Sequence, residues 1–137
     1  FVYSRRLPFH AKRFNDWLEQ MPQNIVRSKG IVWLAQYNEV ACLLSQAGSS
    51  CNISPVTYWV ASMPKEKREE ILAQRRDVAE SWDIEYGDRK TQFVIIGTDL
   101  DQEKIEKKLD ECLLNSSEMN SDWYQLEDPY HWKIRKP

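Results

Sequence analysis

The stretch TQFVIIG, residues 91–97, contains the unbroken apolar run FVII. Such a run is typical of a strand that is covered on both faces, and it marks the candidate central strand of the fold. The segment before it, residues 64–82, is rich in helix formers and has Glu and Lys or Arg spacings that suit i,i+4 pairs. The segment after it predicts the clearest helix, capped by Asp101 and ending near Asn115. The second half of the chain therefore predicts one strand between two helices.

A strand, a helix and three more strands are predicted ahead of this unit. Phe14, Trp17, Leu18 and Met21 stand at i, i+3, i+4 and i+7, which is one apolar stripe of a helix, and Pro22 ends it. The predicted strands cover residues 1–6, 24–35, 39–47 and 52–62. The order βαβββαβα predicts an α+β fold, with a mostly antiparallel sheet of about five strands and about three helices gathered on one face.

Length and composition indicate one folded domain. The chain has 137 residues, of which 42% are hydrophobic and 29% charged, and its formal net charge is −2. These values are close to those of globular proteins, and no apolar run approaches the roughly 18 to 20 residues of a membrane span. We therefore expect a cytoplasmic protein without a membrane partner. The charge argues against broad binding to nucleic acid but leaves room for a local basic stripe.

The cysteines and histidines predict no metal site. Cys42, Cys51 and Cys112 are widely spaced and form no CxxC motif, and the two histidines, His10 and His131, lie far from them and from each other. Structural zinc needs four clustered ligands. We expect reduced, buried thiols; a disulfide between Cys42 and Cys51 across a hairpin is the alternative.

The sequence lacks the common catalytic motifs. It contains no GxxxxGK[ST], GxGxxG, HExxH or GxSxG pattern. We therefore predict no catalytic, cofactor-binding or metal-binding residues in this chain and no cofactor of its own. An active site assembled from residues far apart in the sequence is the competing interpretation.

A set of basic side chains forms the candidate interaction surface. NIVRSKGIVWLA, residues 24–35, places two cations just before a glycine and an apolar run. Others flank the start of the first helix, and we expect all of them to gather on one edge if the first strand, first helix and second strand pack together. The candidate residues are Arg5, Arg6, His10, Arg13, Arg27 and Lys29. The alternative is that these long side chains lie along a sheet edge and stay hydrated.

Both ends of the chain carry information about its context. The sequence starts at Phe1 without an initiator methionine, so we expect it to be a piece of a longer polypeptide or a processed chain. Residues 116–137 mix acidic and aromatic residues, too aromatic for a pure linker and too irregular for a helix. We expect a domain over residues 1–115 and a tail over 116–137 that packs on it or is partly flexible.

Four segments in order resemble the carboxy-terminal domain of the CobW family of P-loop GTPases. The paired features are Tyr3 and Arg6 before Pro8-Phe9, and Arg27-x-Lys29-Gly30 before Trp33. The residues 118–130, EMNSDWYQLEDPY, also resemble the tail of some members. The four segments are FVYSRRLPFHAKRF (1–14), RSKGIVWLA (27–35), QFVIIGTDLD (92–101) and IEKKLDECLL (105–114).

The resemblance implies a two-domain protein that acts as a metallochaperone or metal-insertion factor for zinc, or for cobalt in corrin assembly. GTP and a divalent metal would bind an amino-terminal GTPase domain, whose phosphate loop and Cys-x-Cys-Cys motif are absent from this chain. The chain also departs from members that carry a histidine-rich stretch here, so a metal reservoir role is not supported.

The expected partners are the GTPase domain of the same polypeptide and a metalloprotein client. Arg27 and Lys29 would present a basic edge to one of them, and Trp33 would be buried as an anchor of the strand. Gly30 would let the backbone bend or be approached closely. The alternative is a purely structural domain that stabilises the GTPase domain.

Overall fold

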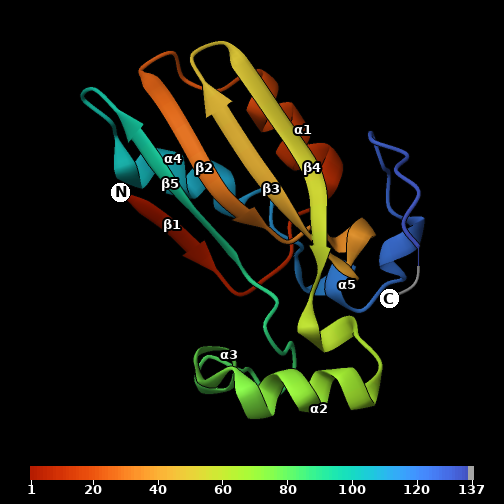
Figure 1. The fold of residues 1–137 in the computed structure, drawn as a ribbon. Helices are drawn as coiled ribbons and strands as arrows, with labels where there is room; N and C mark the ends of the chain where they lie inside the picture. Colours follow the sequence, from red (N-terminus) through yellow and green to blue (C-terminus); the bar gives the residue numbers. More distant parts are fainter. Residues whose placement is uncertain (136–137) are drawn as a thin grey trace.

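A five-stranded antiparallel sheet in the order β1-β5-β2-β3-β4 forms the body of the molecule (Figure 1). The computed structural model describes residues 1–135. The strands are β1 (Val2–Arg5), β2 (Ile25–Val32), β3 (Val40–Ala47), β4 (Ser50–Tyr58) and β5 (Thr91–Gly97). The predicted α+β class, with a mostly antiparallel sheet of five strands, is confirmed.

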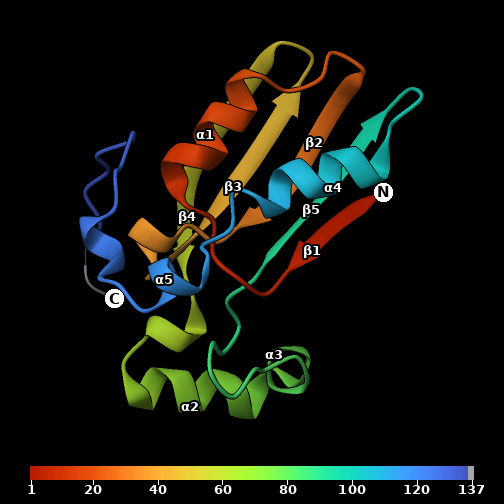
Figure 2. The same cartoon turned by 180° about the vertical axis from the view of Figure 1, so that it is seen from behind.

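Two helices, α1 (Ala11–Glu19) and α4 (Gln102–Asp110), cover one face of the sheet (Figure 2). His10 caps α1 and Asp101 caps α4, each by accepting a hydrogen bond from a backbone N–H in the first turn. The remaining helices of the described residues are α2 (Lys65–Gln74), α3 (Arg76–Glu80) and α5 (Ser116–Met119). Within residues 1–135 the other face of the sheet carries no helix (Figure 1).

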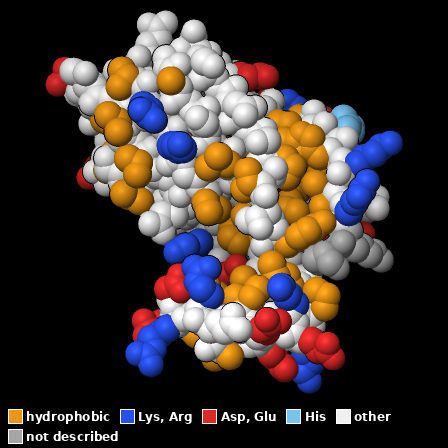
Figure 3. All heavy atoms as spheres, in the orientation of Figure 1, with side chains coloured by type: hydrophobic (Ala, Val, Ile, Leu, Met, Phe, Trp, Pro, Cys, Tyr) orange, Lys and Arg blue, Asp and Glu red, His pale blue; other side chains and the backbone are white. Residues whose placement is uncertain are grey.

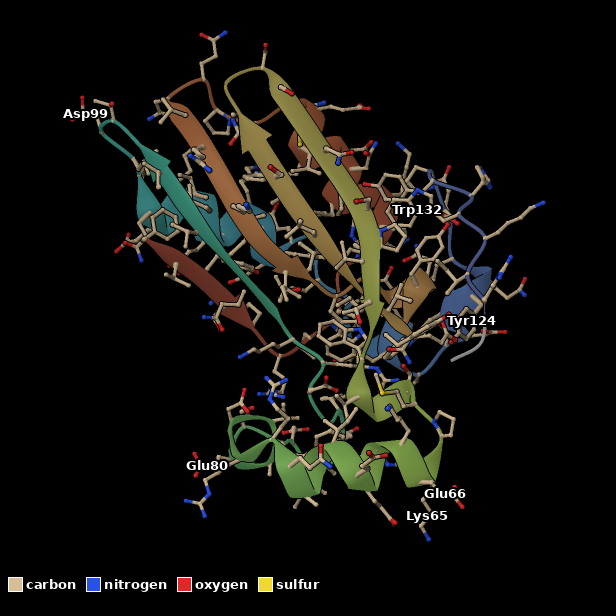
Figure 4. The ribbon with its side chains drawn as sticks, in the orientation of Figure 1. Lys65, Glu66, Glu80, Asp99, Tyr124 and Trp132 are labelled. Atoms are coloured by element: carbon tan, nitrogen blue, oxygen red, sulfur yellow. The ribbon has the colours of Figure 1, made fainter. Side chains whose placement is uncertain are left out.

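Helices α2 and α3 form an arm, residues 64–82, that extends from the end of the sheet between β4 and β5 (Figure 1). The sequence predicts one helix here, but the backbone turns extended at Arg75 and divides it. Neither helix has a buried residue. Lys65, Glu66 and Glu80 point away from the sheet (Figure 4), as expected for a segment without an apolar stripe.

The main core lies between the sheet and the helices α1 and α4. Phe9 stacks on Phe14 with ring centroids 4.3 Å apart, and Tyr3 and Phe93 contact them from the strands. The last predicted helix is shorter than expected, because α4 ends at Asp110. The apolar residues after α4 still complete the core, since they are buried as an irregular segment; they are Cys112, Leu113 and Leu114.

The central strand is β2, which pairs with both β3 and β5. The choice of residues 91–97 as the central strand is wrong, because β5 is second from an edge and only one of its faces is covered. Gly30 of β2 lies opposite Phe93, so close that a Cβ on Gly30 would be 2.4 Å from Phe93 Cα. The prediction of a close backbone approach at Gly30 is therefore confirmed.

All three cysteines are free thiols. Cys42 is buried and lies opposite Pro55, whereas Cys51 lies opposite Gln46 and is exposed. The structure thus agrees with reduced cysteines, but the expectation that all three are buried is wrong for Cys51, because it lies on the outer strand β4.

The predicted tail packs on the domain over its described part, residues 116–135; the last two residues lie outside the described range. Tyr130 and Trp132 stack with centroids 4.4 Å apart and contact the main core. Gln36 donates to the carbonyl of Glu127 at 2.8 Å, and the Tyr37 hydroxyl donates to Asp128. Figure 4 shows Trp132 on the side of β4. The division at residue 115 stays a prediction.

Candidate interaction surface

The structure separates the six candidate residues into two sets. The sequence predicts one cluster, but β5 lies between β1 and β2 in the sheet and keeps the first strand apart from the second. Arg5, Arg6, His10 and Arg13 bond to other parts of the same chain. Arg27 and Lys29 are exposed and lie opposite the exposed Ile96 and Val94, on the sheet face without helices. The expectation of a single basic edge is therefore wrong.

Arg5 joins β1 to α4. Its Nε donates to Asp110 at 2.9 Å, and one of its terminal nitrogens lies 3.4 Å from Glu106. The guanidinium also lies over the ring of Tyr3, whose hydroxyl donates to the same Asp110. These contacts place Arg5 in the fold and leave it little freedom to meet a partner.

Arg6 holds the base of the arm. Its guanidinium donates to three backbone carbonyls, those of Gly87 at 2.8 Å, Ser81 at 3.1 Å and Arg89 at 3.4 Å. Asp88, Arg89 and Tyr86 tie the same segment to residues 60–61, Asn38 and Trp33, and Arg6 adds its attachment to the end of β1.

We expect Arg6→Ala to increase amide hydrogen exchange across residues 81–89 severalfold, because three carbonyls lose a charged donor. Exchange in β2 and β3 is expected to stay unchanged. Arg76→Ala is the matched control, since Arg76 is exposed and its side chain makes no hydrogen bond within residues 1–135. Equal exchange in the two variants would show that Arg6 does not hold the arm.

His10 serves the fold as a helix cap. It is 8% exposed, and its Nδ1 accepts a hydrogen bond from the backbone N–H of Arg13 at 3.4 Å. Burial, together with the positive charge of Arg13, lowers the pKa of His10 below its usual value. His10 is therefore neutral near pH 7 and adds no charge to a basic surface.

Arg13 joins α1 to the tail through a bidentate ion pair with Glu118, both distances being 2.7 Å. It also donates to the carbonyl of Leu113 at 3.0 Å. The hydrogen bonds from Arg13 lower the pKa of Glu118 to about 2. Glu118 further accepts from the backbone N–H of Asn115, so the pair fixes the start of α5.

This ion pair predicts a loss of stability in acid. The pKa of Glu118 is lower in the folded than in the unfolded chain, so its contribution is complete above pH about 4.5 and is lost as the pH falls toward about 2. We expect the difference in free energy of unfolding between wild type and Glu118→Gln to shrink over this interval in urea titrations. A difference that stays constant with pH would contradict the assignment.

The helix-free face of the sheet is the second feature of the site, and we call it the open face. Along β1, β2, β3 and β5 its residues alternate with buried ones such as Tyr3, Ser28 and Phe93, and none of the open-face residues is buried. They are Val2, Ser4, Arg27, Lys29, Ile31, Leu43, Ser45, Ala47, Ser50, Asn52, Ser54, Gln92, Val94 and Ile96. No Asp or Glu stands among them.

Apolar side chains are exposed on the open face beside the two cations. Val94 is 40% and Ile96 51% exposed, so the expectation that this strand is covered on both faces is wrong within the described chain. Val94 lies between Val2 and Lys29 in the register, and Ile96 lies beside Arg27. Figure 3 views this face and shows Lys and Arg side chains among apolar ones.

Arg27 and Lys29 make no ion pair or side-chain hydrogen bond within residues 1–135. They occupy the middle strand of a face whose remaining residues are aliphatic or polar and uncharged. The sequence singled out these two cations but missed their apolar neighbours, because that requires knowing which strand pairs with β2. The period of two within residues 91–97 places Val94 and Ile96 on one face of their strand, but no signal in the sequence sets that face beside Arg27 and Lys29.

The sequence profile of the cobalamin synthesis protein CobW C-terminal domain matches residues 1–113 of this chain. The chain belongs to the CobW C-terminal domain family. The resemblance seen in the sequence is thereby confirmed.

Among curated proteins, this CobW C-terminal domain is similar to the zinc-regulated GTPase metalloprotein activator 1 of Dictyostelium discoideum, with 29% identity over 87% of the chain and 26% of that protein. It is similar also to a zinc chaperone of Mycobacterium tuberculosis, with 28% identity over 93% of the chain and 33% of that protein. The chain thus spans about a quarter to a third of the length of these relatives.

The fold of the CobW C-terminal domain resembles part of a solved structure, the Zn(II)-bound YjiA GTPase from E. coli. The TM-score is 0.54 at 14% sequence identity, over 83% of this chain and 29% of that one. At this identity the likeness shows the fold alone.

Over residues 1–135 no group of three His, Cys, Asp or Glu side chains is placed to hold a metal ion. A hollow of about 480 Å³ along α4 is lined by four acids and Lys107. All its lining residues belong to α4 or its C-cap, and Arg5 pairs with two of them, Glu106 and Asp110. No helix in this range is both long and apolar enough to cross a bilayer.

Proposed function

We propose that this CobW C-terminal domain is a non-catalytic interaction module of a GTP-dependent metal chaperone or metal-insertion protein that handles zinc or cobalt in the cytoplasm. GTP and the divalent metal would bind a GTPase domain of the same polypeptide, which is also the main partner of this module. The names of the relatives, a zinc chaperone and a zinc-regulated GTPase metalloprotein activator, support this assignment.

The open face is the observation that carries the proposal. Helices cover one side of the sheet, while the other side exposes Val94, Ile96 and two cations without internal partners. Exposed aliphatic residues next to unpaired charges are typical of a surface that another protein covers. A second candidate partner is a metalloprotein client that receives the metal.

The competing proposal is a purely structural domain that only stabilises the GTPase domain. One experiment distinguishes the two proposals. Thermal melting and client binding are measured for the full-length polypeptide and for a form without this module. An interaction module is expected to change client binding or GTP-dependent metal transfer while the GTPase domain melts at nearly the same temperature. A fall in melting temperature with unchanged client binding would favour the structural role.

The isolated module is expected to bind neither GTP nor Zn²⁺ tightly, since it has no phosphate loop and no ligand cluster within residues 1–135. Isothermal calorimetry with each ligand measures this. Submicromolar binding of either one would overturn the proposal of a non-catalytic adaptor.

A further inference from the structure

The spacing of the two free cations matches one turn of a helix. Arg27 and Lys29 are two residues apart on β2 and project from the same face, so their Cα atoms are about 6.6 Å apart. Residues i and i+4 of an α-helix are separated by about 6 Å along the axis. Two carboxylates at these positions can therefore meet both cations at once when the helix lies along β2.

The flanks of β2 suit such a helix. A helix about 10 Å wide that lies on β2 also reaches the neighbouring strands, which are about 4.8 Å away on each side. On one side it meets Val94 and Ile96 of β5, and on the other Ser45 and Ala47 of β3. The aliphatic side offers apolar contact, and the small side chains allow close approach.

The charge of the open face favours a partner surface that carries negative charge. The whole chain has more acidic than basic residues, 21 against 19, yet the open face holds two cations and no acid. Any acidic side chain brought there meets only positive charge, whereas a basic one is repelled. Two cations between aliphatic residues are too few for a nucleic-acid backbone, which is bound through many phosphate contacts.

We propose that the open face seats a surface helix of the GTPase domain that carries Asp or Glu at positions i and i+4 and an aliphatic flank. This inference rests on the proposed function and names the chemistry of the partner surface. The carboxylates pair with Arg27 and Lys29, and the aliphatic flank covers Val94 and Ile96. The helix then forms the third layer on the uncovered side of the sheet.

Lysine labelling on the full-length polypeptide tests this arrangement. We expect Lys29 to react with an acetylating reagent about tenfold or more slowly in the full-length protein than in the 137-residue chain, because its amine is paired and covered. Lys104 on α4 is exposed on the other layer and serves as the internal reference. In the full-length protein, Arg27→Glu should restore the reactivity of Lys29, and moderate salt should weaken the protection of Lys29. Arg76→Glu, the same charge change on the arm, should leave that protection unchanged.

A carbodiimide cross-link identifies the occupant, since it joins the Lys29 amine to a carboxylate in direct contact. The expected product joins Lys29 to an Asp or Glu that has a second acid one helical turn away in the GTPase domain. A cross-link from Lys29 to a loop, a strand or a client protein would overturn the helix inference. A protection of Lys29 that survives Arg27→Glu would overturn it as well. Either result would leave the proposed function as an interaction module unaffected. Equal reactivity of Lys29 in both forms, with no link, would overturn docking through the open face altogether.

Discussion

Trp33→Ala is expected to lower the free energy of unfolding by about 3 to 5 kcal/mol, the usual range for removing a large buried aromatic side chain. Trp33 is fully buried, which confirms the sequence-based prediction. Its ring contacts Tyr86 from the base of the arm and Trp123 from the tail, with centroids 5.1 and 6.2 Å away. Its indole N–H donates to Asn38 at 2.8 Å. One side chain therefore joins three parts of the chain at the end of the sheet.

Urea denaturation measures this loss, and two variants separate its causes. Trp33→Phe keeps most of the apolar volume, so it should lower the free energy of unfolding clearly less than Trp33→Ala does. Its remaining effect comes from the lost part of the ring and the lost hydrogen bond to Asn38. Trp132→Ala is the matched control, since this tryptophan is only partly buried and lies on the tail. A loss below about 1 kcal/mol for Trp33→Ala would place the ring at the surface and make a ligand-stacking role the better explanation.

The sequence predicted the elements well because their local signals are strong. The stripe that starts at Phe14 and the cap at Asp101 both define helices in the structure. Apolar runs, alternation and turn signals located all five strands to within a few residues. The break at Arg75 could not be predicted, because the segment 64–82 is rich in helix-forming residues and contains no Gly or Pro after Pro64 to mark an end.

The sequence could not predict the site because it depends on strand order. An apolar run such as that of β5 has the same appearance whether its second face is covered by the same chain or left open, as it is at Val94 and Ile96. Arg5 and Arg27 look equivalent in the sequence. Arg5 lies opposite the buried Thr91 and forms an ion pair with Asp110 at the end of α4, whereas Arg27 lies opposite the exposed Ile96 on the open face.

Gly30→Ala is the second change for which we expect a large effect, a destabilisation of about 3 kcal/mol or more by overpacking. A Cβ at this position would lie 2.3 Å from the carbonyl oxygen of Gln92 and 2.5 Å from Phe93 Cβ. Neither atom is the end of a flexible side chain, so the added methyl group can be accommodated only if β2 and β5 move apart. That movement breaks the ladder at the centre of the sheet.

Gly48→Ala is the control that separates this close approach from the general effect of replacing a glycine. Gly48 has φ 58° and no atom within 4 Å of its added Cβ. Its replacement should therefore lower the free energy of unfolding only by the strain of a left-handed backbone with a side chain, about 1 to 2 kcal/mol. Equal midpoints in urea for the two variants would contradict the close approach at Gly30. A larger loss at Gly30 would show that the missing side chain is what lets β2 lie against β5, and it is this pairing that sets Lys29 beside Val94 on the open face.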